Sequence, residues 1–130
     1  DAILLIGEAL DAARVVEFIK LARMLEMAVL LEVHSLETLR WVLNAVDLKL
    51  RPGVLLGINN RDLDRQVVDI SHTERVAPRI PPTWPFVAES GVKTRADVKR
   101  LHAAGAKALL VGETLMRSEK PEEAIRALFG

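Results

Sequence analysis

The segment Ala28-Val-Leu-Leu-Glu-Val-His34 decides the fold class, because its apolar residues follow one another without alternation and end at a carboxylate and an imidazole. Such a run is typical of a strand that is buried on both faces of a parallel sheet. Similar runs start at residues 3, 54, 86 and 108: Ile3-Leu-Leu-Ile6, Val54-Leu-Leu56, Phe86-Val-Ala88 and Ala108-Leu-Leu-Val111. The spacing between consecutive runs leaves room for a helix after each strand.

The residues between these runs have helical patterns. Residues 11–26 place apolar side chains at helical spacing, and Ser35 is a candidate N-cap for a second helix. Ser71-His-Thr-Glu74 has the pattern of a capping box before a short third helix, Thr94-Arg-Ala-Asp97 opens a fourth, and Pro121 opens the last. The sequence therefore predicts five consecutive βα units.

Strands that alternate with helices in this way form either an open doubly wound sheet or a (βα)8 barrel. No G-x-G-x-x-G motif follows any strand, which disfavours a dinucleotide-binding fold. We predict an α/β protein in which residues 1–130 are the carboxyl-terminal part of a single (βα)8 barrel domain. A complete barrel commonly needs about 250 residues, so five units are expected to form an incomplete barrel.

Composition excludes several classes of protein. Lys+Arg and Asp+Glu are balanced at 18 each, no cysteine is present, and no apolar run approaches the roughly 20 residues of a membrane span. Three scattered histidines have no metal-ligand spacing, so we expect no metal and no other cofactor. We also expect no nucleic-acid or membrane partner and a cytoplasmic location, or a plastid location if the source is a plant.

Polar residues follow the predicted strands, where both parallel architectures place their functional sites. The alternation of side chains along a strand puts Glu32, Asn59 and Glu89 on one face, so two carboxylates and an amide should converge. A carboxyl group in a barrel mouth is partly desolvated, which raises its pKa and suits it to proton transfer. A salt bridge to a neighbouring Lys or Arg is the alternative for Glu32.

Other polar residues have structural interpretations. Arg61 and Asp62 are expected to form an ion pair that stabilises their loop, and the three histidines, His34, His72 and His102, are expected to be structural or solvated. Glu8 fits either a pocket or the solvent.

Two glycine-containing turns, Ser90-Gly91 and Gly112-Glu-Thr114, follow the last two strands. Glycine lets backbone N–H groups approach an anion closely, and barrels commonly bind phosphate between the loops after their last two strands. These turns therefore predict a phosphate site, although both glycines also suit a tight turn.

The same segments resemble the indole-3-glycerol phosphate synthase family in order and spacing. The most specific is Gly57-Ile-Asn-Asn-Arg-Asp-Leu63, whereas Glu89-Ser-Gly91 also fits other phosphate-binding barrels. Further matching segments are Asp1-Ala-Ile-Leu-Leu-Ile6, Leu31-Glu-Val-His34, Ala88-Glu-Ser-Gly-Val92 and Leu110-Val-Gly-Glu-Thr-Leu-Met-Arg117. The resemblance implies a (βα)8 barrel and a lyase of tryptophan biosynthesis, which closes the pyrrole ring of 1-(2-carboxyphenylamino)-1-deoxyribulose 5-phosphate with loss of carbon dioxide and water.

The resemblance also implies roles for individual residues. Glu32 matches the general base of the dehydration, Asn59 an amide that orients the substrate, and Glu89 a carboxylate that lines the site. Arg61 matches a motif position near the pocket. The positions that match the phosphate-binding residues are Ser90, Gly91, Gly112 and Glu113.

The catalytic lysines of the family, including its general acid, belong to amino-terminal units that these residues do not match. The chain alone is therefore expected to be inactive, and to bind the missing units or to self-associate through open sheet edges at Ile3–Ile6 and Ala108–Val111. The alternatives are another phosphate-binding barrel, such as phosphoribosylanthranilate isomerase, and a half-barrel that does no chemistry.

Overall fold

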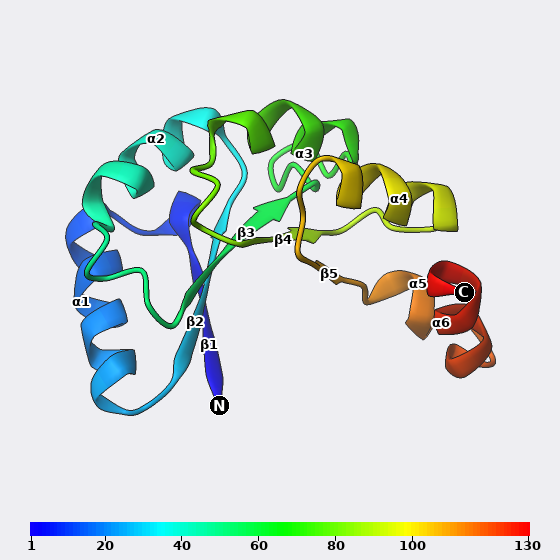
Figure 1. The fold of residues 1–130 in the computed structure, drawn as a ribbon, viewed down its shortest axis with the longest axis horizontal. Coiled ribbons are helices and arrows are strands. Elements are labelled where there is room, and N and C mark those ends of the chain that lie inside the picture. The colour runs from blue at the N-terminus through cyan, green and yellow to red at the C-terminus, as the bar shows by residue number, and fades with distance from the viewer.

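The five apolar runs form one sheet that is parallel throughout and follows chain order, in a computed structural model that describes residues 1–130 (Figure 1). The outer strands β1 and β5 each pair with a single neighbour, so the sheet is open at both edges. The strands are β1 (Ala2–Ile6), β2 (Ala28–Val33), β3 (Val54–Asn59), β4 (Phe86–Glu89) and β5 (Ala108–Leu110). The predicted fold class, an incomplete α/β barrel of five parallel strands, is confirmed.

The helices lie along the outer side of the curved sheet (Figure 1). None of them combines the length and the apolar character needed to cross a membrane. They are α1 (Ala12–Met24), α2 (Leu36–Ala45), α3 (Ser71–Val76), α4 (Arg95–Ala103), α5 (Glu113–Met116) and α6 (Pro121–Phe129), with 3₁₀ turns η1 (Gly7–Ala9) and η2 (Ala77–Arg79). The four-residue helix α5 is absent from the sequence prediction, because one turn is too short to show a hydrophobic period.

Side-chain caps begin three of the helices. Asp11 accepts from Arg14 N at 2.8 Å, Ser35 accepts from Thr38 N at 3.0 Å, and Thr94 forms a reciprocal capping box with Asp97. Each cap satisfies a backbone N–H that has no partner within its own helix.

The capping box predicted for α3 is wrong. Ser71 lies inside the helix, where its N–H donates to the Asp69 carboxylate at 2.9 Å, and the helix has no side-chain cap of its own. Glu74 pairs instead with Arg100 of α4. The Glu74 carboxylate, which the local pattern predicted to cap α3, thus forms a tertiary ion pair instead.

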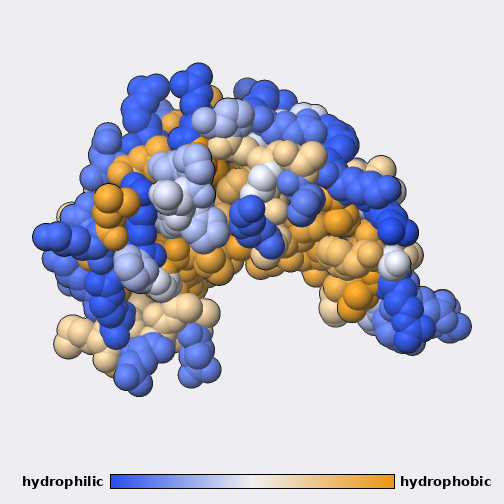
Figure 2. All heavy atoms as spheres, in the orientation of Figure 1, coloured by the Kyte–Doolittle hydropathy of each residue, from blue (hydrophilic) through white to orange (hydrophobic).

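The two faces of the sheet have opposite exposures. On the outer face, Leu31, Leu56 and Ala88 are fully buried beneath the helices. On the inner face, Leu4 is 51% exposed and Leu55 is 44% exposed. Register places these two in one row, with Leu30 between them, and apolar surface lines the hollow of the arch (Figure 2). The inner face therefore presents apolar surface that nothing in this chain covers.

Candidate functional site

Glu32, Asn59 and Glu89 come together at the carboxyl ends of β2, β3 and β4. The register pairs Glu32 with Gly57 and Asn59 with Glu89, so all three side chains stand on the inner face. Asn59 Nδ2 donates to Glu32 Oε1 at 3.0 Å, and Asn59 Oδ1 accepts from Arg61 N at 2.9 Å. The second bond fixes which end of the amide faces Glu32.

Burial of these groups is deep for charged and polar side chains. Glu32 is 6%, Asn59 7% and Glu89 4% exposed, although the sheet is open. The alternative of a salt bridge for Glu32 is wrong, because its carboxylate accepts from an amide and none of the ion pairs includes it.

The Glu89 carboxyl group lies over Gly57, where a Cβ atom would overlap its Oε1. That oxygen is buried and has no hydrogen-bond partner. Burial, followed by the hydrogen bond with Glu32 and its negative charge, raises the pKa of Glu89 to about 8. At pH 7, below this pKa, Glu89 is therefore mostly protonated.

A second feature is a cavity of about 610 Å³ beyond the ends of β4 and β5. Gly91 has φ +84°, and a Cβ there would meet Val68 and Ile70, so only glycine fits this turn. Gly112 has ordinary dihedral angles, and a Cβ there would point into open space. The residues predicted for the phosphate site all line this cavity: Arg61, Ser90, Gly91, Gly112 and Glu113.

The charges around this cavity are mostly positive. Arg61, Lys93 and Arg117 line it, against one carboxylate, Glu113. Glu113 pairs with Arg61 at 3.2 Å and with Arg117 at 3.0 Å. The ion pair predicted between Arg61 and Asp62 is therefore wrong, since Asp62 instead accepts from the backbone N–H groups of its own turn.

Sequence reasoning missed the residues that tie the strand ends together. Glu8 accepts from the N–H groups of His34 and Ser35 at 2.7 and 2.9 Å, so it holds the end of β2 although it is itself exposed to solvent. The rings of His34 and His72 stack with their centroids 4.2 Å apart. The only signal in the sequence for these contacts is that Glu8 and His34 follow predicted strands. No group of His, Asp and Glu side chains lies close enough to hold a metal ion.

The comparisons with known proteins agree with this arrangement. The chain is 44% identical to the indole-3-glycerol phosphate synthase of Bacillus velezensis over 130 residues and 46% identical to that of Variovorax paradoxus over 129 residues. These matches cover 100% and 99% of this chain but 50% and 46% of the relatives, so the chain spans about half their length.

A solved structure of 3-hexulose-6-phosphate synthase superposes on 98% of this chain and 60% of its own, with a TM-score of 0.66. At 18% identity this likeness shows the fold alone. The family model for indole-3-glycerol phosphate synthase matches residues 1–128. With a family model matched over nearly the whole of its length, the chain belongs to the indole-3-glycerol phosphate synthase family.

Proposed function

We propose that this chain supplies five βα units of a barrel that catalyses the indole-3-glycerol phosphate synthase reaction. The observation that carries the proposal is a buried carboxyl pair with an amide on the inner face, next to a cavity rimmed by three cations. A phosphorylated substrate with its own carboxylate needs both an anion site and a desolvated proton-transfer site.

The carboxyl pair fits the dehydration step of this reaction. Closing the pyrrole ring requires a proton on the oxygen that leaves as water and a base that removes a proton from the substrate. Because Glu89 carries a proton at pH 7, Glu32 is the carboxyl group of the pair that can act as that base. The amide of Asn59 holds Glu32 and orients the substrate.

The cavity fits the phosphate group. Ser90-Gly91 and Gly112-Glu113 face it from two loops, and Arg61 lies at its edge. Backbone N–H groups of such turns bind phosphate oxygens, and an anchored phosphate fixes the reacting atoms relative to Glu32.

The open edges call for a partner. Leu4 of β1 and Leu110 of β5 are about half exposed, and each of these strands leaves one edge unpaired. We propose that further βα units cover these edges and supply the general acid, and that the chain without them self-associates.

The function is tested by adding the amino-terminal half of the Bacillus velezensis relative to residues 1–130. We expect ring closure only when both parts are present, and no turnover of phosphoribosylanthranilate, the substrate of the competing isomerase. The chain alone should form oligomers by sedimentation. A soluble monomer that closes the ring unaided would contradict the proposed partner, and inactivity of a folded complex would contradict the function.

The phosphate site is tested by Gly112→Leu. Because a Cβ at position 112 meets nothing within 4 Å and φ is −111°, the variant should fold, while its side chain enters the space of the anion. We expect the Kd for inorganic phosphate to rise at least about tenfold, equivalent to about 1.4 kcal/mol, in a calorimetric titration. Ala103→Leu, on the exposed side of α4, is the control. Unchanged phosphate binding in Gly112→Leu would place the site elsewhere.

A further inference from the structure

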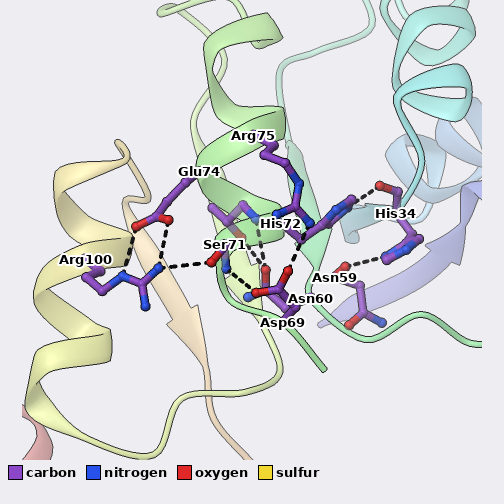
Figure 3. A network of polar contacts seen from close by, with 10 residues as sticks. His34, Asn59, Asn60, Asp69, Ser71, His72, Glu74, Arg75 and Arg100 are labelled. Carbon is purple, nitrogen blue, oxygen red and sulfur yellow. Dashed lines mark hydrogen bonds and ion pairs between the residues drawn. The ribbon is translucent and has the colours of Figure 1, made fainter. Parts of the chain in front are cut away.

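A polar network joins the strand ends, and apart from Asn59 its residues have no part in the proposed catalytic roles (Figure 3). It begins at His34, directly after β2, and passes through Asn59 and Asn60 at the end of β3. It ends at His72 and Thr73, in the first turn of α3. The network therefore connects the segment that carries Glu32 to an element outside the sheet.

His34 is the centre of this network, because three of its polar groups are bonded to other segments. Its backbone N–H donates to Glu8, its ring Nδ1 donates to the Asn59 carbonyl at 2.7 Å, and its own carbonyl accepts from His72 Nε2 at 2.5 Å. The register between β2 and β3 ends one residue pair before this point. The imidazole thus donates to the Asn59 carbonyl in place of a backbone N–H, which would have donated there if the pairing of β2 and β3 had continued.

The contact between His34 and Asn59 completes a ring of hydrogen-bonded residues that includes Glu32, the candidate base. Glu32 is the penultimate residue of β2, and His34 follows the last one directly. Glu32 accepts from the amide of Asn59 at 3.0 Å, and His34 donates to the carbonyl of the same residue. Asn59 is held at both its backbone and its side chain, so it cannot turn away from Glu32 without breaking one of these bonds.

The hydrogen bonds also show which nitrogen of each imidazole carries a hydrogen toward its partner. Both end on backbone carbonyls, which only accept, so His34 carries its hydrogen on Nδ1 and His72 on Nε2. The rings stack with 19° between their planes. Burial lowers the pKa of His72 below its usual 6.5; the hydrogen bond to the His34 carbonyl opposes this shift, and the charge of Arg75 adds to it. The charged groups around the pair are Glu8 from η1, Asp62 and Asp69 from the loop after β3, and Arg75 from α3.

Helix α3 gives His72 a fixed position. Asn60 Oδ1 accepts from the N–H and the hydroxyl of Thr73 at 3.1 and 2.8 Å, and Asn60 Nδ2 donates to the Ser90 carbonyl at 3.1 Å. On its other side, Glu74 pairs with Arg100 of α4 at 2.8 Å (Figure 3). The helix is therefore braced against the ends of β3 and β4 and against α4.

We propose that His34 and His72, as a stacked pair of imidazoles, are positioning residues that hold Asn59 against Glu32. The catalytic importance of Glu32 rests on the proposed function. The contacts among His34, Asn59 and Glu32 are independent of that function. Neither ring touches the Glu32 carboxylate itself; both act through the backbone at the ends of β2 and β3. Loss of the His34 ring should release Asn59, and with it the Glu32 carboxylate.

Nuclear magnetic resonance of residues 1–130 tests the geometry without an assay of activity. Long-range ¹⁵N–¹H spectra of the wild-type chain should show a hydrogen on Nδ1 of His34 and on Nε2 of His72. An Nδ1 without a hydrogen at His34, or an Nε2 without one at His72, would overturn the proposal. This measurement needs no substitution, so it tests the geometry of the two imidazoles even if a variant does not fold.

The pKa of Glu89, measured from the chemical shift of its carboxyl carbon against pH, provides the comparison between variants. His34→Ala should lower the pKa of Glu89 below about 8, because Glu32 moves away, while burial still keeps that pKa above its usual 4.5. His34→Asn should retain the wild-type pKa, since its amide N–H occupies the place of Nδ1. His102→Ala, an exposed histidine on α4, is the matched control. Equal shifts in both His34 variants, or no shift in either, would overturn the proposal.

Activity is measured in the chain joined to the amino-terminal half of the Bacillus velezensis relative. His34→Ala should lower kcat about tenfold or more with a smaller change in KM, because the phosphate contacts belong to other strands, and His34→Asn should restore kcat. A rise in KM alone, or no rescue by Asn, would overturn the proposal. If the wild-type barrel closes no ring, the proposed function fails, and the tautomers and titrations still decide the positioning role.

Discussion

Glu32→Gln is expected to lower kcat by about 100-fold or more in the completed barrel, with KM nearly unchanged. Glutamine has almost the same shape and still accepts the 3.0 Å hydrogen bond from Asn59, so the site should keep its structure. It cannot take a proton from the substrate. The loss corresponds to about 2.7 kcal/mol of transition-state stabilisation, and steady-state kinetics of ring closure measures it.

The control for this prediction is Glu37→Gln, which makes the same chemical change on the exposed face of α2. Its kcat should match that of the wild type. The free energy of unfolding of Glu32→Gln, measured in urea, should show that the variant is folded. A folded Glu32→Gln variant with near-normal turnover would remove Glu32 from the mechanism.

Gly57→Ala should be the most damaging small substitution in the sheet. The added Cβ would overlap Glu89 Oε1 and lie 3.2 Å from Leu30 Cδ1, so the Glu89 carboxyl must leave its place. Overpacking of this kind lowers the free energy of unfolding by about 1 to 3 kcal/mol, which urea denaturation measures. Displacing Glu89 also separates it from Glu32, so the pKa of Glu89 should fall toward 4.5.

The pH dependence provides an independent check of this prediction. Between the unfolded pKa of 4.5 and the folded pKa of about 8, native Glu89 holds a proton that the unfolded chain has lost. The stabilisation linked to this group is therefore fully present below pH 4.5 and decreases as the pH rises through 8. Gly57→Ala should flatten this decrease, measured as the free energy of unfolding against pH.

A double-mutant cycle identifies the cause of the loss. In a Glu89→Ala background the clash is absent, so Gly57→Ala should cost much less there than in the wild type. Gly112→Ala is the matched glycine control, because nothing lies within 4 Å of its added Cβ. Equal costs in both backgrounds would show that the clash with Glu89 is not responsible.

The sequence alone determined the fold class and the face that carries the site. Continuous apolar runs bounded by polar residues predicted all five strands, because a strand covered on both sides needs no alternation. The period of two along a strand then placed Glu32, Asn59 and Glu89 on one face, and the structure brings them together. Local caps were predictable for the same reason at Ser35 and Thr94, since each bond spans only three residues.

Only the tertiary structure decided which partner each polar group has. Arg61 bonds to Glu113, 52 residues away, instead of its neighbour Asp62, and Glu74 bonds to Arg100 instead of capping its helix. The stack of His34 on His72 joins residues 38 positions apart. The periodicity of a sequence predicts only contacts between residues a few positions apart. The contacts above depend on the crossover connections that bring distant segments to one edge of the sheet. The raised pKa of Glu89 has the same origin, because Gly57 and Glu32 reach it only through strand pairing.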